Sequence, residues 1–240
     1  MNSIPSDEQI AKHFDIYSDQ REYWLKKSNY FHSEDLLMLN ELLTSNSSVL
    51  EIGCGTGNLI GRLEIKNGYG IDISEKSIKI AKKKYKKINF LCGDILAFKK
   101  KINRRFDFII ISDTIGYFQD IQKTLKNLHY FCSPFTRIIL SYYSPIWQPL
   151  IKLAEVLKLK MPDLNPPMFS TGDLENFLKI SNFETIKFEK KIISPYKFVF
   201  LGRFINKFVA NLPLINHFCL RQYIVSRSLK KKIEILILRV

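Results

Sequence analysis

The chain has 240 residues, enough for a single α/β domain with a substantial core, and its hydrophobic content of 46% is ordinary for a globular protein. Its 37 basic and 23 acidic residues give a formal net charge of +14, which either favours an anionic partner (nucleic acid, a phosphorylated lipid carrier or a membrane surface) or is spread over solvated faces. The four cysteines lie far apart and form no C-x-x-C pair, so the sequence indicates neither a metal site nor a disulfide framework.

The first part of the chain is expected to be helical. Apolar residues recur at helical spacing within residues 8–44, first at Ile10, Phe14 and Tyr17 and then across residues 36–43. The N-terminus shows no basic stretch followed by an apolar one, so no secretory signal is expected. The chain also has no run of about 18 apolar residues that would predict a spanning helix. The cytoplasm is therefore the expected compartment.

Strands and helices alternate from Ser48 onward. Such alternation predicts an α/β fold with a doubly wound, mostly parallel seven-stranded sheet and ligands at the carboxyl ends of the strands. The predicted strands cover residues 48–53, 69–73, 88–91, 106–112, 136–143, 182–191 and 222–227. The predicted helices cover residues 58–65, 75–86, 119–131, 149–159 and 170–180.

One domain accounts for residues 1–240, because no internal repeat or low-complexity linker divides them. We expect a helical lid at residues 1–46 and a cofactor-binding core at residues 47–145. Substrate-side helices, an insertion and the last strands are expected at residues 146–240, where the strand-like tail at 230–240 has no predicted place in the sheet.

An apolar strand runs into a turn with three alternating glycines within residues 49–59, and an apolar helical pattern begins directly after it. Glycine reaches φ > 0 easily and lets a ligand approach the backbone closely. Asp72 ends the next apolar strand, and Asp94 follows the strand after that. A strand, glycine turn, helix, strand and acid in this order is the general pattern for holding a nucleoside.

The glycine turn departs from the dinucleotide-binding fingerprint, because Gly57 comes one position early and Asn58 stands where the third glycine belongs. No Gly-Lys-Ser/Thr occurs, so a P-loop is excluded. The E-x-G-x-G-x-G form resembles the class I S-adenosylmethionine-dependent methyltransferases, over roughly residues 45–145. The resemblance implies S-adenosylmethionine as cofactor, with residues 51–57 along its methionine part, Asp72 at the ribose and Asp94 at the adenine amino group.

The predicted topology and the resemblance together define a candidate site at one edge of the sheet. The candidate cofactor-binding residues are Glu51, Gly53, Cys54, Gly55, Gly57, Asp72, Ile73, Gly93, Asp94, Ile95, Ser112 and Asp113. In similar methyltransferases an N-terminal helix covers the pocket and its side chains reach the methionine carboxylate, which here implies Tyr17, Arg21, Tyr30 or His32. No metal ligand is expected.

Methyl transfer from a sulfonium depends largely on proximity and alignment, and a base is needed only where the acceptor must lose a proton. The candidate catalytic residues are His32, Asp113, Tyr117 and Tyr142. Asp113 has a second interpretation, in which it orients the ammonium group of the cofactor. Trp147 and Tyr143 either stack on a sugar ring or wall the pocket.

Residues 141–161 also resemble bacterial methyltransferases associated with glycosyltransferases of surface-glycan pathways. That resemblance implies O-methylation of a small-molecule, saccharide or lipid-linked glycan acceptor. An RNA methyltransferase is an alternative suggested by the net charge, but no separate RNA-binding module occurs and no Asn/Asp-Pro-Pro-Tyr follows the fourth strand. A non-catalytic subunit with this fold is a third hypothesis, against which the intact motif residues stand.

The insertion at residues 194–220 contains a basic, aromatic amphipathic pattern. Phe204, Phe208 and Leu212 fall on one helical face together with Ile205 and Val209. Such a helix either lies in a membrane interface or caps its own domain. The first alternative predicts peripheral contact with the inner membrane surface.

Overall fold

The structure, a computed structural model, describes residues 4–98, 101–197, 204, 206–208, 210, 212 and 215–229. The tail at residues 230–240 lies outside the described residues, as do Ile205 and Val209 of the insertion. All seven strands and the helices around the candidate site lie within them.

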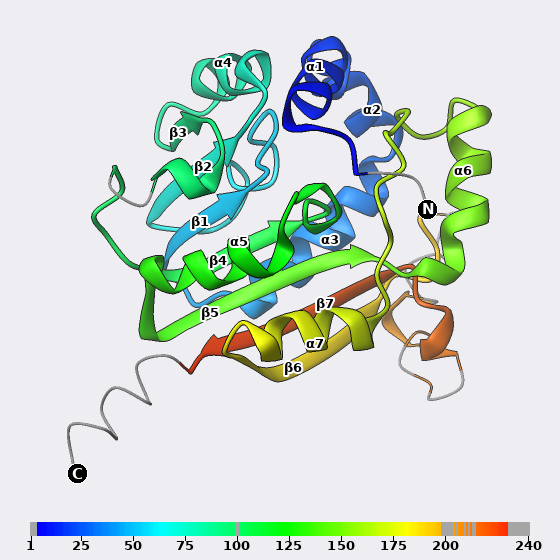
Figure 1. Cartoon of the computed structure of the whole chain (residues 1–240). Helices are drawn as coiled ribbons and strands as arrows, with labels where there is room; N and C mark the ends of the chain where they lie inside the picture. The colour runs from blue at the N-terminus through cyan, green and yellow to red at the C-terminus, as the bar shows by residue number, and fades with distance from the viewer. Residues whose placement is uncertain are drawn as a thin grey trace.

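A seven-stranded sheet forms the centre of the protein (Figure 1). Its strands are β1 (Ser48–Ile52), β2 (Asn67–Asp72), β3 (Asn89–Cys92), β4 (Phe106–Ser112), β5 (Cys132–Tyr143), β6 (Phe183–Lys191) and β7 (Arg221–Ser228). Their order is β3-β2-β1-β4-β5-β7-β6, in which β1 to β5 pair in parallel and β7 runs antiparallel to both β5 and β6. The predicted doubly wound, mostly parallel sheet is confirmed.

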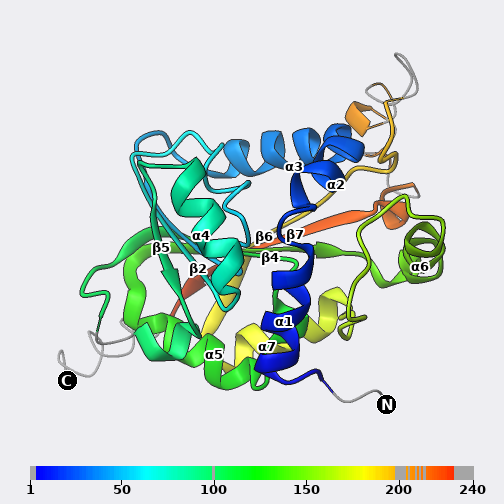
Figure 2. The same cartoon turned by 90° about the horizontal axis from the view of Figure 1, so that it is seen from above.

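Helices cover both faces of the sheet. They are α1 (Asp7–Tyr17), α2 (Arg21–Lys27), α3 (Asn29–Leu42), α4 (Glu75–Lys84), α5 (Ile121–Leu128), α6 (Gln148–Val156) and α7 (Thr171–Ile180), with short 3₁₀ segments that include η3 (His129–Phe131), η4 (Pro145–Trp147) and η6 (Asn216–Phe218). Figure 2 shows α3 and α4 on one side of the sheet and α5 and α7 on the other.

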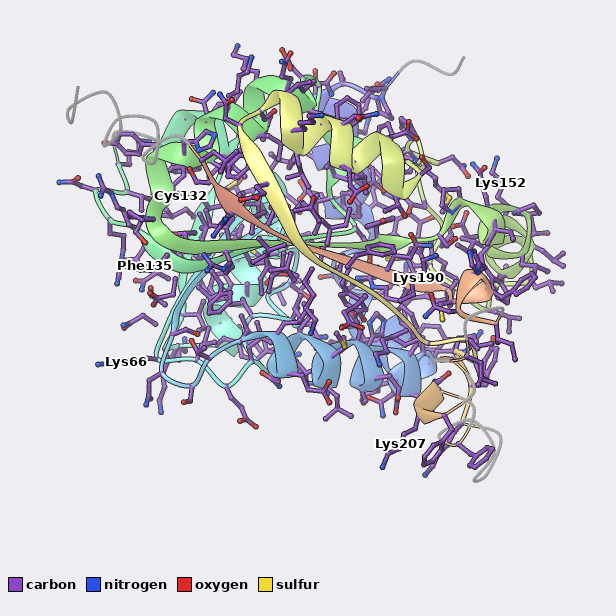
Figure 3. All side chains as sticks on the ribbon, turned by 90° about the horizontal axis from the view of Figure 1, so that it is seen from below. Lys66, Cys132, Phe135, Lys152, Lys190 and Lys207 are labelled. Atoms are coloured by element: carbon purple, nitrogen blue, oxygen red, sulfur yellow. The ribbon has the colours of Figure 1, made fainter. Side chains whose placement is uncertain are left out.

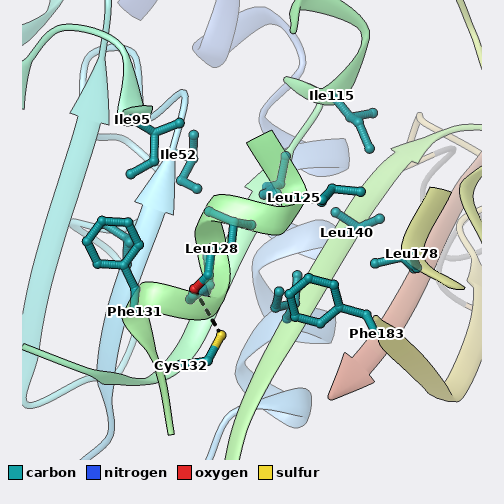
Figure 4. Close-up of a cluster of buried hydrophobic side chains, with 14 of the residues drawn as sticks. Ile52, Ile95, Ile115, Leu125, Leu128, Phe131, Cys132, Leu140, Leu178 and Phe183 are labelled. Atoms are coloured by element: carbon teal, nitrogen blue, oxygen red, sulfur yellow. Dashed lines mark hydrogen bonds between the residues drawn. The ribbon is translucent and has the colours of Figure 1, made fainter. Parts of the chain in front are cut away.

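The buried strands explain this arrangement, because successive residues of a strand point to opposite faces. In β1, Leu50 packs in the cluster that contains α5 and α7, whereas Val49 packs in the cluster that contains α3 and α4. Figure 4 shows the first cluster, where Leu125 and Leu128 of α5 meet Leu140 of β5. Two apolar faces per strand require a helical layer on each side.

The predicted helix over residues 58–65 is wrong, because these residues form successive turns. The Arg62 N–H donates to the Leu59 carbonyl, three residues earlier, at 3.0 Å, so the i→i−4 bonding of an α-helix does not continue here. The Ile60 N–H donates to the buried carboxyl of Glu51, at 3.1 Å. The glycine turn is therefore tied to β1 by a side chain, and the chain reaches β2 without completing a helix.

Other boundaries differ by a few residues. β5 begins at Cys132, before the predicted start at residue 136, because its first residues bridge to the beginning of β4. The helix predicted over residues 119–131 is α5 followed by η3, and it begins after Asp120, whose carboxylate accepts from the Lys123 N–H at 2.8 Å. That contact is an N-cap, which fixes the first turn.

Candidate functional site

A cavity of about 830 Å³ lies at the carboxyl ends of the parallel strands. Its walls come from α1, α2 and the start of α3 on one side, from the ends of β1, β2, β4 and β5, and from η4 and α6 on the other. Every candidate cofactor-binding residue except Gly57 lines it, as do His32 and Tyr117. The volume falls within the range of small-molecule sites.

The glycine turn forms the floor of the cavity beside β1 and β2. The N–H groups of Gly53 and Cys54 donate to the carbonyl of Ile71, at 2.7 and 3.1 Å, which holds the turn against β2. Gly53 has a φ of +74°, and a Cβ there would lie 2.1 Å from the Thr114 hydroxyl oxygen. Glycine is therefore required at this position both by the backbone conformation and by the space available.

Gly57 has a structural role. Its φ is also +74°, and a Cβ there would lie 2.7 Å from the ring of Phe90. Its N–H donates to the carbonyl of Cys54 at 2.8 Å and closes the turn. Gly57 thus shapes the turn that its neighbours present to the cavity without lining the cavity itself.

Asp72 connects the end of β2 to the glycine turn. One carboxylate oxygen accepts from the Gly55 N–H at 2.7 Å and the other accepts from the Ser74 N–H at 2.9 Å. Burial raises the pKa of Asp72, although both of these hydrogen bonds favour its charged form. Asp94 lies at the rim of the cavity, is exposed, and accepts from the Leu96 N–H at 3.0 Å.

Glu51 is the most strongly shifted of the carboxyl groups at the glycine turn. Its side chain is buried, and burial raises its pKa from 4.5 to about 8, with the hydrogen bond from Ile60 opposing the shift. In the absence of a cationic ligand the group is therefore largely protonated at neutral pH. A positive charge nearby would favour the carboxylate.

We expect the Glu51→Gln variant to be more stable than the parent protein at pH 7, with a free energy of unfolding that is larger by about 3 kcal/mol. The folded pKa of about 8 exceeds the unfolded value of 4.5, so the parent loses stability as pH rises from 4.5 to 8, while the amide does not titrate. Urea unfolding of the ligand-free proteins at pH 4.5 and pH 8 measures the difference. If the two proteins differed equally in unfolding free energy at both pH values, the raised pKa of Glu51 would be contradicted.

Arg221, the first residue of β7, forms the centre of a buried polar cluster under the cavity. Its guanidinium donates to both carboxylate oxygens of Asp35, at 2.9 and 3.3 Å, and to the hydroxyl of Ser112 at 2.8 Å. It also donates to Asp113, while the Tyr223 hydroxyl donates to Asp35 at 2.6 Å. The side chain of Arg221 is 1% exposed.

This cluster holds Asp113 in place at the end of β4. Asp113 has a φ of +53°, a conformation that non-glycine residues seldom adopt, and its N–H donates to the Ser141 carbonyl at 2.9 Å. Its side chain is 41% exposed, and that exposure faces the cavity. Neither Arg221 nor Asp35 was expected at the site, because each stands beside other polar residues in the sequence and carries no motif.

His32 lies on the cavity wall from α3. Burial and the nearby positive charge of Arg21 lower the pKa of His32 to about 4, although Asp35 opposes the shift. The imidazole is therefore neutral at pH 7 and has one nitrogen that accepts a proton. Tyr17 and Arg21 of the N-terminal helices line the same cavity, whereas the Tyr30 hydroxyl accepts from Asn206 at 3.2 Å.

The two tyrosines at the end of β5 point in opposite directions. Tyr143 lines the cavity, as does Trp147 of η4. Tyr142, a predicted catalytic residue, lies on the other face, outside the cavity lining, and its hydroxyl donates to Thr171 at 3.2 Å. Tyr117 lines the cavity and donates to Asp163; burial and the charge of Asp163 raise the pKa of Tyr117.

Two cavity-lining residues carry buried donors without a hydrogen-bond partner among the described residues, the Thr56 hydroxyl and the Trp24 indole N–H. Buried donors are almost always paired, and these two are placed where a polar ligand in the cavity could accept from them. Within the same residues, no group of three or more His, Cys, Asp or Glu side chains is arranged to hold a metal ion.

The chain is similar in sequence to methyltransferases. A profile of the family described as "Methyltransferase domain" matches residues 43–168. The malonyl-[acyl-carrier protein] O-methyltransferase of Priestia megaterium is 31% identical over 139 residues, which cover 55% of this chain and 48% of that protein. The chain spans about half the length of the curated relatives it matches.

Solved structures share the fold at low sequence identity. A SAM-dependent methyltransferase from Thermotoga maritima has a TM-score of 0.65 at 18% identity, with 91% of this chain and 99% of that chain covered. The magnesium protoporphyrin IX methyltransferase of Synechocystis, solved with bound SAH, has a TM-score of 0.62 at 15% identity, with 93% and 100% covered. These likenesses establish the architecture alone, because proteins that share an architecture differ in function according to the residues of their sites.

Proposed function

This chain belongs to the methyltransferase domain family, and from that premise we propose that it transfers the methyl group of S-adenosylmethionine to an oxygen atom of a small-molecule acceptor. The observation that carries the proposal is the set of carboxyl groups at the strand ends. Glu51, Asp72 and Asp113 stand at the ends of β1, β2 and β4 and line one cavity. Such groups favour a cationic ligand and disfavour the pyrophosphate of a dinucleotide.

The residues present fit this cofactor. Asp72 would accept from the ribose hydroxyls, Asp94 from the adenine amino group, and Asp113 from the ammonium group. The backbone of Gly53 and Gly55, which a ligand can approach closely, would lie along the methionine part of the cofactor. The unpartnered Thr56 hydroxyl supports a polar ligand directly beside this turn.

When bound, S-adenosylmethionine supplies an electrophilic methyl group, so the residues around it need to align the acceptor and remove its proton. His32 is the base that we propose. Its imidazole is neutral at pH 7 and lines the cavity, close enough to Asp35 and Arg221 for their charges to act on its pKa. The proton of an acceptor hydroxyl would pass to the imidazole as the new carbon–oxygen bond forms.

The wall opposite the glycine turn is apolar. Leu150, Leu153 and Leu157 of the α6 segment line it together with Trp147 and Tyr143. This wall supports an acceptor with an apolar part, and the aromatic pair supports a sugar ring stacked near the methyl group. We therefore propose a saccharide or lipid-linked glycan acceptor, as the resemblance of residues 141–161 implies.

Calorimetric titration is expected to show binding of S-adenosylmethionine and S-adenosylhomocysteine but not of NAD. Transfer of labelled methyl from the cofactor to cell fractions (lipid-linked glycans, free nucleotide sugars and total RNA) then identifies the acceptor class. The His32→Gln variant should retain cofactor affinity and lose most of the transfer. Binding of NAD alone would overturn the cofactor, and labelling of the RNA fraction alone would overturn the acceptor.

A further inference from the structure

Exposed apolar side chains concentrate at one end of the molecule. Among the described residues, more than half of the exposed large hydrophobic side chains lie in residues 146–159 and 196–218. Val156 of α6 is 79% exposed, and Phe204 and Phe208 are each 56% exposed. A concentration of exposed apolar side chains on one surface marks a site of interaction.

The two segments are joined side by side. The Trp147 indole N–H donates to the carbonyl of Phe218 at 3.0 Å, which ties η4 to η6. Beneath this contact, Ile151 of α6 packs in a cluster with Ile192 and Leu220. We define these exposed parts, residues 146–159 and the described residues of 196–218, as the apical face.

The apolar side of the insertion points outward. The Phe208 N–H donates to the Phe204 carbonyl at 2.9 Å in one helical turn, and their rings lie 5.1 Å apart. Asn206, from the opposite side of the same turn, is buried. Its side-chain amide oxygen accepts from the backbone N–H groups of Ile193 and Ser194, both at 3.0 Å. Phe204 and Phe208 therefore lie at the surface, whereas Asn206 of the same turn packs against the protein.

The apical face is also basic. No Asp or Glu occurs in the sequence between Glu189 and Glu234, and the exposed residues there include Lys197 and Lys207. In α6, Lys152 is exposed, while the acidic residue of that helix, Glu155, pairs with Lys160 at 2.7 Å. Figure 3 shows Lys152, Lys190 and Lys207 at this end of the molecule, and Lys66 and Phe135 at the other.

Some of the exposed apolar residues belong to the cavity as well. Leu150, Leu153 and Tyr196 are exposed and line it, so the apical face borders the cavity. We propose that the apical face docks on an anionic membrane surface, so that the cavity opens towards the lipid. Apolar side chains would enter the interface and lysines would meet anionic headgroups. The proposal rests on the proposed function, because docking would serve to bring a lipid-linked acceptor to the cavity.

The test is sedimentation of the full chain with vesicles of phosphatidylcholine alone or with phosphatidylglycerol added. We expect binding to the anionic vesicles, weakened between 0.05 and 0.5 M salt because exposed charges are screened. The Lys152→Gln/Lys197→Gln variant should bind about 25-fold more weakly at low salt, at about fivefold per lysine. The Lys66→Gln/Lys86→Gln variant, which removes equal charge elsewhere, should bind like the parent.

The apolar contribution has its own matched control. The Phe204→Ser/Phe208→Ser variant should bind at least tenfold more weakly at every salt concentration, because apolar burial is not screened. The Phe135→Ser variant, at an 82% exposed phenylalanine on the far end, should have no effect. Thermal unfolding is expected to be unchanged in all of them, since these side chains are exposed.

Three results would overturn the docking surface. These are equal binding by all variants, retention on RNA instead of vesicles with a steep salt slope, and self-association that the Phe204→Ser/Phe208→Ser variant abolishes while vesicles stay unbound. Titration with S-adenosylhomocysteine is run on the same samples. Cofactor binding without vesicle binding rejects the docking surface and leaves the proposed methyl transfer standing, whereas vesicle binding without cofactor binding does the reverse.

Discussion

The Arg221→Met variant is expected to lose about 3–5 kcal/mol of unfolding free energy, because it leaves buried carboxylates without their partner. Asp35 is 5% exposed, and once the guanidinium is removed the hydrogen bond from Tyr223 is the one that its side chain keeps among the described residues. Asp113 loses the same partner at the cavity. Urea unfolding measures the stability, and titration with S-adenosylhomocysteine measures whether a released Asp113 weakens cofactor binding.

The control for this prediction lies on the same strand. Arg227 of β7 pairs with Glu184 at 2.7 Å, with both side chains more than a third exposed, so Arg227→Met should cost no more than about 1 kcal/mol. A second variant, Arg221→Met/Asp35→Asn, removes the unpaired charge and should recover part of the loss. If Arg221→Met were no more harmful than Arg227→Met, the buried cluster would not be a stabilising ion pair.

The Asp72→Ala variant is expected to weaken binding of S-adenosylhomocysteine by at least 100-fold, and Asp94→Ala by about tenfold. Asp72 would make two charge-assisted bonds to the ribose, each worth about 1.5–3 kcal/mol, and it also holds the N–H groups of Gly55 and Ser74. Asp94 is exposed and would accept one bond from the adenine amino group. Calorimetric titration compares the two variants.

Thermal unfolding separates the two ways in which Asp72 acts. Asp72→Asn loses the charge and keeps one of the two accepting oxygens, because its NH2 group cannot accept from the second backbone N–H. Its stability should fall by about 1–3 kcal/mol, the cost of one unpaired buried N–H, while its affinity falls by more. Unchanged affinity in Asp72→Ala would show that this carboxylate does not hold the ribose. A fall in stability that matches the fall in affinity would show that it acts only through the turn.

The sequence predicted the sheet and the edge at which the cavity lies, because glycine spacing and buried apolar strands are local signals. It could not predict the Arg221–Asp35 contact, since 186 positions separate the two residues and neither has a motif. Tyr142 and Tyr143 illustrate another limit. Only one of two adjacent strand residues can face the cavity, and which of the two does so depends on how β5 packs against its neighbours.

The helix predicted over residues 58–65 is absent although its apolar residues pack inward, since Ile60 and Leu63 are buried. The backbone does not sustain the hydrogen bonds of an α-helix, because the Arg62 N–H donates to a carbonyl three residues earlier. Apolar spacing therefore located the buried side chains but could not show how the backbone between them is bonded, nor that the Ile60 N–H donates to Glu51.

The position of β7 has a consequence for how the protein is made. β7 comes last of the seven strands along the chain yet lies between β5 and β6. During synthesis, the edges of β5 and β6 that pair with β7 therefore stay unpaired until residues 221–228 leave the ribosome. Asp35 likewise lacks its ion-pair partner Arg221 until then. Exposed strand edges attract other chains. A stalled or shortened product that ends before β7 should depend on chaperones and be removed by proteolysis.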